Sequence, residues 1–250
     1  MPKPPKLNID SLFKSKVINT RVTIKKGIPE NLKLNRKIFY TSKARKRILE
    51  FKGLQRTFYN ETRKPGFTFY EDSKGRFRIR KINTKMENIR EFYILELNTS
   101  TGVEKYFIKE QRLAKDNPLL KEDPNYLLKM SHNAFNQARA LEILKKLGIT
   151  VIDQEYAFVN KDRSFLVSEF KDHLFTIDEA KDKGIISLEL KQLMEDKLVD
   201  LNTEINNYFK KYSKNPRVLS DIGTHNTFID NKAGELFIFD IMISNIDKKQ

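Results

Sequence analysis

Three polar side chains near the end of the sequence have the types and the spacing that phosphate chemistry needs. Asp221 closely follows an apolar pair, Asn226 comes five residues later, and Asp240 ends an apolar run fourteen residues after Asn226. An amide oxygen beside a carboxylate suits a hard cation such as Mg²⁺, which prefers oxygen ligands. The sequence therefore predicts a Mg²⁺ site at Asn226 and Asp240, with Asp221 free to orient or deprotonate a hydroxyl group.

A β-hairpin must bring these residues together. The runs NTFID (226–230) and ELFIFDIM (235–242) are β-prone and flank a turn-forming cluster. Folding the chain across that turn places Asn226 near Asp240. Lys109 lies on an upstream β-prone run and is a candidate to supply the positive charge that a bound phosphate requires.

The first part of the chain predicts an antiparallel sheet. Hairpins are expected over 66–82 and 91–113, because each segment holds two β-prone runs around turn-forming residues. Lys109 falls on the last of these strands. A helix is expected over 41–60, where apolar residues recur at three- and four-residue steps and predict a packing face. These apolar residues are Ile48, Phe51, Leu54 and Phe58.

The rest of the chain predicts helices among further strands. The segments 132–149 and 188–212 have helical periodicity, and the segments 149–160 and 163–170 are β-prone. A strand-rich front half with helices behind it indicates the α+β class.

A resemblance to the protein-kinase-like superfamily is carried by the run SDIGTHNTFID…FIFD. The family's catalytic Asp, followed by four residues and an Asn, matches Asp221 and Asn226, and its metal-binding Asp matches Asp240. The run YFIK resembles the family's lysine strand, which makes Lys109 the phosphate-binding lysine. The run FLVSEF (165–170) resembles the strand that leads to the hinge between the lobes.

The resemblance implies a kinase-like bilobal fold of the compact atypical type, similar to RIO, lipopolysaccharide and aminoglycoside/choline kinases. Residues 66–170 are then expected to form a β-rich N-lobe, and residues 171–250 a small, truncated C-lobe with the catalytic-loop hairpin. Residues 1–65 precede them as a basic N-terminal arm plus a helix. The implied activity is phosphotransfer that depends on ATP and Mg²⁺, and the sequence does not identify the acceptor.

Departures from the family pattern leave a second interpretation open. No Gly-rich loop precedes the lysine strand, and Gln137 stands where the compact families place a helix Glu. Gln137 can hold Lys109 by a hydrogen bond but not by charge. Glu142 is the nearest carboxylate on that helix and points elsewhere; both it and Gln137 are predicted nucleotide-binding residues. The alternative is a catalytically inactive pseudokinase scaffold that binds nucleic acid or acts in an assembly.

The distribution of charge favours a polyanionic partner. Residues 1–90 contain 25 Lys and Arg against 7 Asp and Glu, a net charge of +18, whereas residues 91–250 have a net charge of −3. A basic third of this kind indicates nucleic acid or another polyanion as a partner. A solvated, lysine-rich surface is the alternative interpretation.

The composition excludes several classes of protein. With no Cys among its 250 residues, the chain forms no disulfide and no thiolate metal site. No stretch resembles a signal peptide, and no window reaches the roughly 18 apolar residues that a membrane span needs. We therefore expect a soluble, cytoplasmic protein with no membrane partner.

Overall fold

The structure is a computed structural model, and it describes residues 38–40, 48–82, 90–113, 117–130, 133–159, 162–212, 217–230, 232 and 235–245. These residues divide into two compact units. The first, the sheet unit, contains Asn35–Ala138 and Asp153–Phe170. The second, the hairpin unit, contains Arg139–Ile152 and Lys171–Gln250. The division falls inside helix α5 (Ala134–Lys146).

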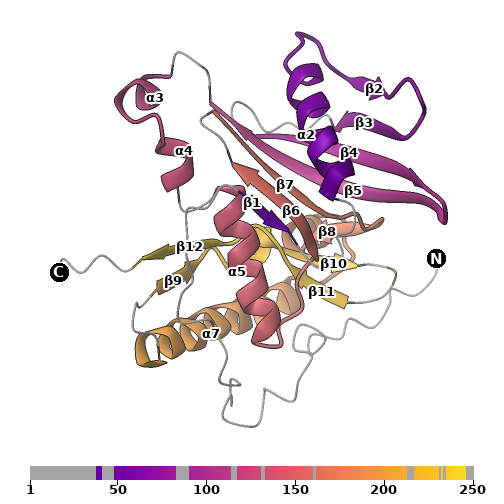
Figure 1. Cartoon of the computed structure of the whole chain (residues 1–250). Helices are drawn as coiled ribbons and strands as arrows, with labels where there is room; N and C mark the ends of the chain where they lie inside the picture. The colour runs from indigo at the N-terminus through magenta and orange to yellow at the C-terminus, as the bar shows by residue number, and fades with distance from the viewer. Residues whose placement is uncertain are drawn as a thin grey trace. The chain divides into compact units, whose positions relative to one another are not determined.

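A seven-stranded antiparallel sheet forms the sheet unit, in the order β1-β6-β7-β5-β4-β3-β2 (Figure 1). Its strands are β1 Ile38–Tyr40, β2 Phe69–Glu71, β3 Phe77–Ile82, β4 Arg90–Thr99, β5 Gly102–Arg112, β6 Gln154–Val159 and β7 Arg163–Glu169. The unit also contains the short helices α3 (Pro118–Glu122) and α4 (Tyr126–Lys129). Helices combined with an antiparallel sheet confirm the α+β class.

The two hairpins predicted for this sheet are confirmed as β2–β3 and β4–β5. In the first, Gly75 N donates to the Asp72 carbonyl at 2.7 Å, and Gly75 has a φ of 63°. Gly adopts this left-handed backbone without strain because it has no Cβ. The Asp72 carboxylate closes the turn by accepting hydrogen bonds from Arg76 and from the Lys74 N–H. The Arg76 guanidinium holds the pKa of Asp72 below its ordinary value.

Helix α2 (Ile48–Glu61) covers one face of the sheet (Figure 1). Leu54 and Phe58 of its predicted apolar stripe are buried there, which confirms these two residues as a packing face. The Phe58 ring meets the rings of Tyr93 and Phe165 edge-on, with centroids 4.8 Å apart in both pairs. Full burial of a side chain of this size contributes about 1.5–3 kcal/mol, so this contact holds α2 on the sheet.

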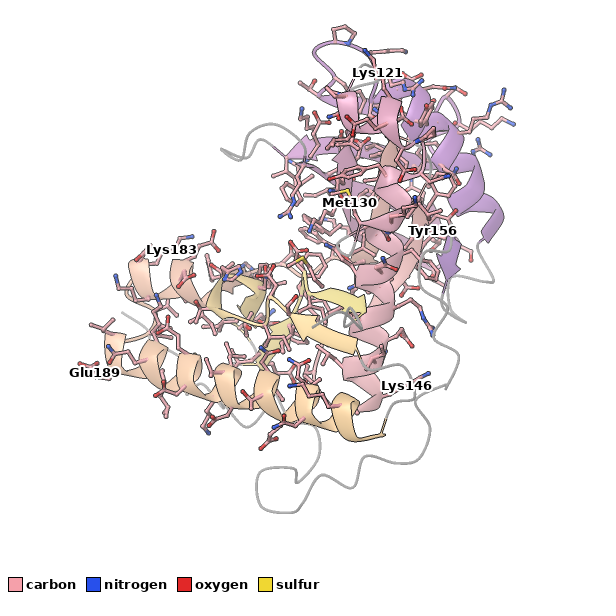
Figure 2. All side chains as sticks on the ribbon, turned by 90° about the vertical axis from the view of Figure 1, so that its left-hand side faces the viewer. Lys121, Met130, Lys146, Tyr156, Lys183 and Glu189 are labelled. Carbon is pink, nitrogen blue, oxygen red and sulfur yellow. The ribbon has the colours of Figure 1, made fainter. Side chains whose placement is uncertain are left out.

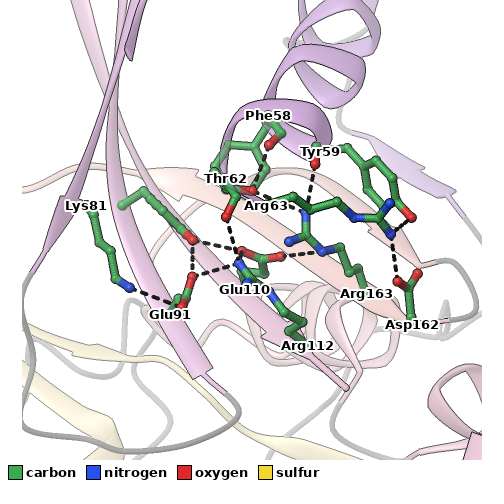
Figure 3. Close-up of polar contacts among 11 residues, drawn as sticks. Phe58, Tyr59, Thr62, Arg63, Lys81, Glu91, Glu110, Arg112, Asp162 and Arg163 are labelled. Carbon is green, nitrogen blue, oxygen red and sulfur yellow. Dashed lines mark hydrogen bonds and ion pairs between the residues drawn. The ribbon is translucent and has the colours of Figure 1, made fainter. Parts of the chain in front are cut away.

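A buried ion-pair network that the sequence did not indicate lies on the same face of the sheet (Figure 3). Glu110 of β5 and Arg163 of β7 are almost fully buried, and Arg163 Nε lies 3.1 Å from Glu110 Oε1. The carboxylate also accepts hydrogen bonds from Tyr93 Oη at 2.9 Å and from Arg112 Nη2 at 3.3 Å. Burial raises the pKa of Glu110, and the two guanidiniums act against that rise.

The same network fastens the C-terminal end of α2. Arg163 Nη1 donates to the Tyr59 carbonyl and to Thr62 Oγ1, each at 3.2 Å. Arg112 Nη2 donates to the Thr62 carbonyl at 3.2 Å, and to Glu91 of β4 at 2.9 Å. Removing one member of this network leaves the remaining buried charges with fewer opposite charges and hydrogen bonds, which costs stability in the interior.

The hairpin unit contains the predicted long helix, α7 (Leu188–Tyr212), whose predicted bounds are confirmed. Among the residues of α7 whose burial is described, the buried apolar side chains are Met194, Leu198, Leu201 and Ile205. Helix α6 (Ile177–Asp182) lies along α7, with Lys183 and Glu189 near one end of the pair (Figure 2). The strands are β8 Leu174–Thr176, β9 Arg217–Ser220, β10 Thr227–Asp230, β11 Glu235–Ile238 and β12 Met242–Asn245. They form two antiparallel sheets, β11-β10-β8 and β12-β9.

Three predicted strand boundaries are wrong. β11 ends at Ile238, and Asp240 lies between β11 and β12, because its φ of 58° breaks the strand before the chain turns to pair with β9. Asn226 lies in the 3-10 turn η2 rather than in β10. β6 begins at Gln154 instead of residue 149, since residues 150–152 exchange backbone hydrogen bonds with Ile238.

Some predicted features lie outside the described residues. They are most of the predicted basic N-terminal arm, over 1–37, and the beginning of the first helix, over 41–47. Among the helices that the structure describes, none combines the length and the apolar character that crossing a membrane requires.

Candidate functional site

The predicted catalytic loop is a closed turn in the hairpin unit. It runs from Asp221, directly after β9, to Asn226, directly before β10. Asn226 Nδ2 donates to the Asp221 backbone carbonyl at 2.9 Å, so the amide clamps the loop. Asn226 is buried. Its Nδ2 is a donor and is engaged in this bond, so Oδ1 is the side-chain atom that is suited to bind a cation.

The hairpin of β10 and β11 (Thr227–Asp230 and Glu235–Ile238) brings Asp240 beside this loop. Phe239 N donates to the Asn226 carbonyl at 2.8 Å, one step beyond the paired residues of the hairpin, and Asp240 is the next residue. Within the described part of the chain, no group of three His, Asp or Glu side chains is arranged to hold a metal ion. Mg²⁺ sites often use only one or two carboxylates, with substrate phosphates and water as the other ligands.

Asp221 and Asp240 share an uncommon backbone conformation. Their φ angles are 72° and 58°, in the left-handed region. Among the described residues other than Gly, only His173 shares it. Such a conformation costs an L-residue roughly 1–2 kcal/mol, less for Asp, which can hydrogen-bond locally. Residues of this kind cluster at functional sites, where the surrounding structure holds them.

His225 contacts the predicted catalytic carboxylate, which the sequence analysis did not foresee. Its Nε2 lies 2.9 Å from Asp221 Oδ1. The only signal in the sequence is the spacing of four residues between the two, and this spacing alone is weak because loop histidines are usually solvated.

A second set of contacts holds the loop against α6 and α7. Thr224 Oγ1 donates to Asp178 Oδ2 at 3.3 Å, and Lys191 Nζ lies 2.8 Å from Asp178 Oδ1. Thr227 Oγ1 donates to the Gly223 carbonyl at 2.9 Å. Partial burial of Asp178 favours a higher pKa, but the bonds from Lys191 and Thr224 outweigh it and hold the pKa below its ordinary value.

We expect Asp178→Asn to lower the stability of the protein at neutral pH by up to about 1 kcal/mol, because it removes a partly exposed ion pair with Lys191. The folded-state pKa of Asp178 lies below its unfolded value. Its contribution is therefore present above the unfolded pKa and is lost as the pH falls through the folded pKa. The difference in urea midpoint between variant and wild type should shrink over that acidic range.

Asp182→Asn is the matched control, because Asp182 lies on the same helix and its side chain is 71% exposed. Equal losses of midpoint in the Asp178 and Asp182 variants at neutral pH would contradict the role of Asp178 in bracing the loop.

Lys109 lies in the sheet unit and is buried in the middle of the sheet. Its neighbours across the ladder are Phe92 of β4 and Leu166 of β7. Side chains alternate along a strand, and Ile108 belongs to the core beneath α2. Lys109 therefore points to the opposite face of the sheet from α2.

The beginning of α5 packs on the face that carries Lys109. Ala134 N donates to Ser164 Oγ at 2.8 Å, and Ser164 lies two residues from the cross-strand neighbour of Lys109, on the same face. Gln137, about one helical turn after Ala134, is buried and belongs to the sheet unit, as Lys109 does. Glu142 is half-buried and belongs to the hairpin unit.

A scan against protein-family models and a search of curated protein sequences found no match to the chain. The functional assignment therefore depends on the geometry and chemistry of the residues themselves.

Proposed function

We propose that the chain is an ATP- and Mg²⁺-dependent phosphotransferase with a kinase-like bilobal fold. The observation that carries the proposal is the closed loop from Asp221 to Asn226, with Asp240 directly beside it. In this function Asn226 and Asp240 bind Mg²⁺ through their side-chain oxygens. Asp221 accepts the proton of the acceptor hydroxyl group.

The chemistry of phosphoryl transfer suits so small a set of residues. Phosphoryl transfer requires that the reacting groups are positioned and that the phosphate charge is neutralised, with little covalent participation by the protein. The left-handed backbone of Asp221 and Asp240 supports the proposal, because both carboxylates are held in a conformation that the surrounding loop must enforce.

Lys109 has the phosphate-binding role in this proposal. An ammonium group on a central strand is held by the sheet around it, and functional groups on such rigid elements are positioned more accurately than groups on loops. Gln137 is assigned to hold Lys109 by a hydrogen bond, and Gln137 and Glu142 keep their predicted role in nucleotide binding.

ATP with Mg²⁺ should raise the melting temperature of the wild-type protein, and Asp240→Ala should remove this effect. Nucleotide binds only the folded chain, so at 100 times its Kd it stabilises by about 2.7 kcal/mol. Asp230→Ala is the control, because Asp230 lies at the other end of the same hairpin. The absence of a shift in the wild type at millimolar nucleotide, with Mg²⁺ or with Mn²⁺, would contradict the proposal.

A second candidate function is binding of nucleic acid or another polyanion on an inactive kinase-like scaffold. Exposed cations of the sheet unit favour it. Arg56, Lys74 and Arg80 are exposed, and the structure shows no ion pair for them among the described residues. They lie within residues 1–90, whose net charge is +18.

Heparin or single-stranded nucleic acid should bind the full chain at low salt, with an affinity that falls steeply as salt is added. Replacing Arg56, Lys74 and Arg80 with Ser should reduce the salt slope by roughly one for each phosphate contact removed. The matched control replaces the exposed Lys181, Lys210 and Lys232 of the hairpin unit. Equal effects of the two triple variants, measured by fluorescence anisotropy, would show non-specific attraction by net charge.

A further inference from the structure

His225 makes a directed contact with one oxygen of the Asp221 carboxylate. Nε2 lies 2.9 Å from Oδ1, and the structure shows no hydrogen bond to Oδ2 among the described residues. The Asp221 side chain is 36% exposed, so its carboxylate is accessible to a molecule from solvent. The two oxygens of the carboxylate therefore differ: Oδ1 contacts the imidazole, and Oδ2 has no hydrogen-bond partner among the described residues.

The His225 ring is confined by the loop that carries it. A Cβ atom placed on Gly223 would lie 3.0 Å from Cε1 and 3.1 Å from Nδ1 of His225, closer than side chains normally approach. The backbone of Gly223 is extended, so the loop needs Gly there for space and not for its dihedral angles. The imidazole thus packs closely over the Gly223 backbone.

The residues on either side of His225 are also fixed. Thr224 is buried and bonds Asp178, and Asn226 is buried and bonds the Asp221 carbonyl. With both neighbours anchored, His225 is directed by the backbone towards Asp221. The His225 side chain is 60% exposed, yet it contacts Asp221 instead of water alone.

We propose that His225 is a positioning residue for Asp221, an inference that rests on the proposed phosphotransfer function. By holding Oδ1, His225 turns Oδ2 towards the acceptor hydroxyl group. The acceptor oxygen then forms its bond to the γ-phosphorus while its proton passes to Oδ2 of Asp221. The bond from the γ-phosphorus to the bridging oxygen breaks, and ADP leaves with the electron pair. His225 touches none of the reacting atoms.

The effect of His225 should appear in turnover and not in nucleotide binding. His225→Ala should lower kcat by about 10- to 100-fold, because a small misplacement of a catalytic group has effects of that size. The KM for ATP should be unchanged. His225→Gln should recover much of the rate, since its side-chain amide can donate to Oδ1 from a similar position. Gly223→Ala, which displaces the ring but keeps both partners, should lower kcat in the same direction.

The test measures ADP formation by the full chain at saturating ATP and Mg²⁺, with water or an added alcohol as the acceptor. Each variant is made in the wild-type and the Asp221→Asn background, and thermal melts confirm folding. If His225 acts through Asp221, His225→Ala has little further effect once Asp221 is Asn. An unchanged kcat in His225→Ala, or an equal loss in both backgrounds, overturns the inference while leaving the proposed function standing. No ADP formation by the wild type overturns the proposed function, and the inference with it.

Discussion

Arg163→Met is expected to lower the free energy of unfolding by about 3–5 kcal/mol, the size seen when one partner of a buried ion pair is removed. Arg163 and Glu110 are almost completely buried, and the substitution leaves the longer contact with Arg112, at 3.3 Å, to compensate the Glu110 charge. It also removes the hydrogen bonds to the Tyr59 carbonyl and to Thr62 Oγ1, which fasten the end of α2 (Ile48–Glu61). Urea unfolding followed by circular dichroism measures the change.

Arg78→Met is the matched control for this substitution. Arg78 also lies on a strand of the sheet unit, and its ion pair with Glu71 has the same close geometry, at 2.9 Å. Those two side chains are 50% and 40% exposed, so the expected loss is about 0–1 kcal/mol. If Arg163→Met does not fold, Arg163→Lys, which keeps the charge, provides the measurement. Equal losses for the Arg163 and Arg78 variants would contradict the importance of the buried network.

The penalty of Arg163→Met should also depend on pH. Burial already raises the pKa of Glu110, and loss of a neighbouring guanidinium raises it further. Between the ordinary carboxyl pKa and this raised pKa, Glu110 is therefore protonated in the variant's folded state and ionised in its unfolded state. Its stability relative to the wild type should recover as the pH falls, because a protonated Glu110 has no charge to leave unpaired.

Asp221→Asn is expected to lower the rate of ADP formation by about 10²–10⁴, the usual effect of losing an acid–base group. The substitution keeps the shape of the side chain and the bond from Asn226 Nδ2, which goes to the backbone carbonyl. Stabilisation by Mg²⁺ and ATP should therefore be nearly unchanged. Lys109→Ala should weaken both nucleotide stabilisation and rate, because it removes the positive charge that we propose binds phosphate.

The control for this substitution is Asp230→Asn. Asp230 ends β10 (Thr227–Asp230) at the far end of the hairpin, where its carboxylate accepts from the Lys232 N–H. A kcat in Asp221→Asn equal to that of the Asp230 control would show that Asp221 is not the proton acceptor.

Elements with one long apolar face could be predicted from the sequence. The whole of α7 (Leu188–Tyr212) and both sheet hairpins have periodic apolar residues that become buried. Helix α6 (Ile177–Asp182) was missed because it is too short to show a period. Its capping box, in which Thr176 and Glu179 bond each other's backbone N–H, was a local signal that could have located its start.

The buried ion pair could not be predicted in the same way. Glu110 and Arg163 become neighbours only through the pairing of β5 with β7, and charged residues within a strand usually indicate a solvated face. At the candidate site, the proximity of Asn226 and Asp240 follows from a local hairpin and could be predicted. The contact between His225 and Asp221 could not be predicted, because a spacing of four residues within a loop does not specify a contact between the two side chains.

Calorimetric titration of ATP into the full chain, with Mg²⁺ and then with EDTA, tests the central claim most directly. The claim predicts a heat of binding that requires the metal, is lost in Asp240→Ala, is reduced in Lys109→Ala and is unchanged in Asp230→Ala. The absence of a binding heat for the wild type with ATP, in both Mg²⁺ and Mn²⁺, would contradict the claim. A wild-type heat that is unchanged in EDTA, or an Asp240→Ala heat equal to that of the wild type, would contradict it as well.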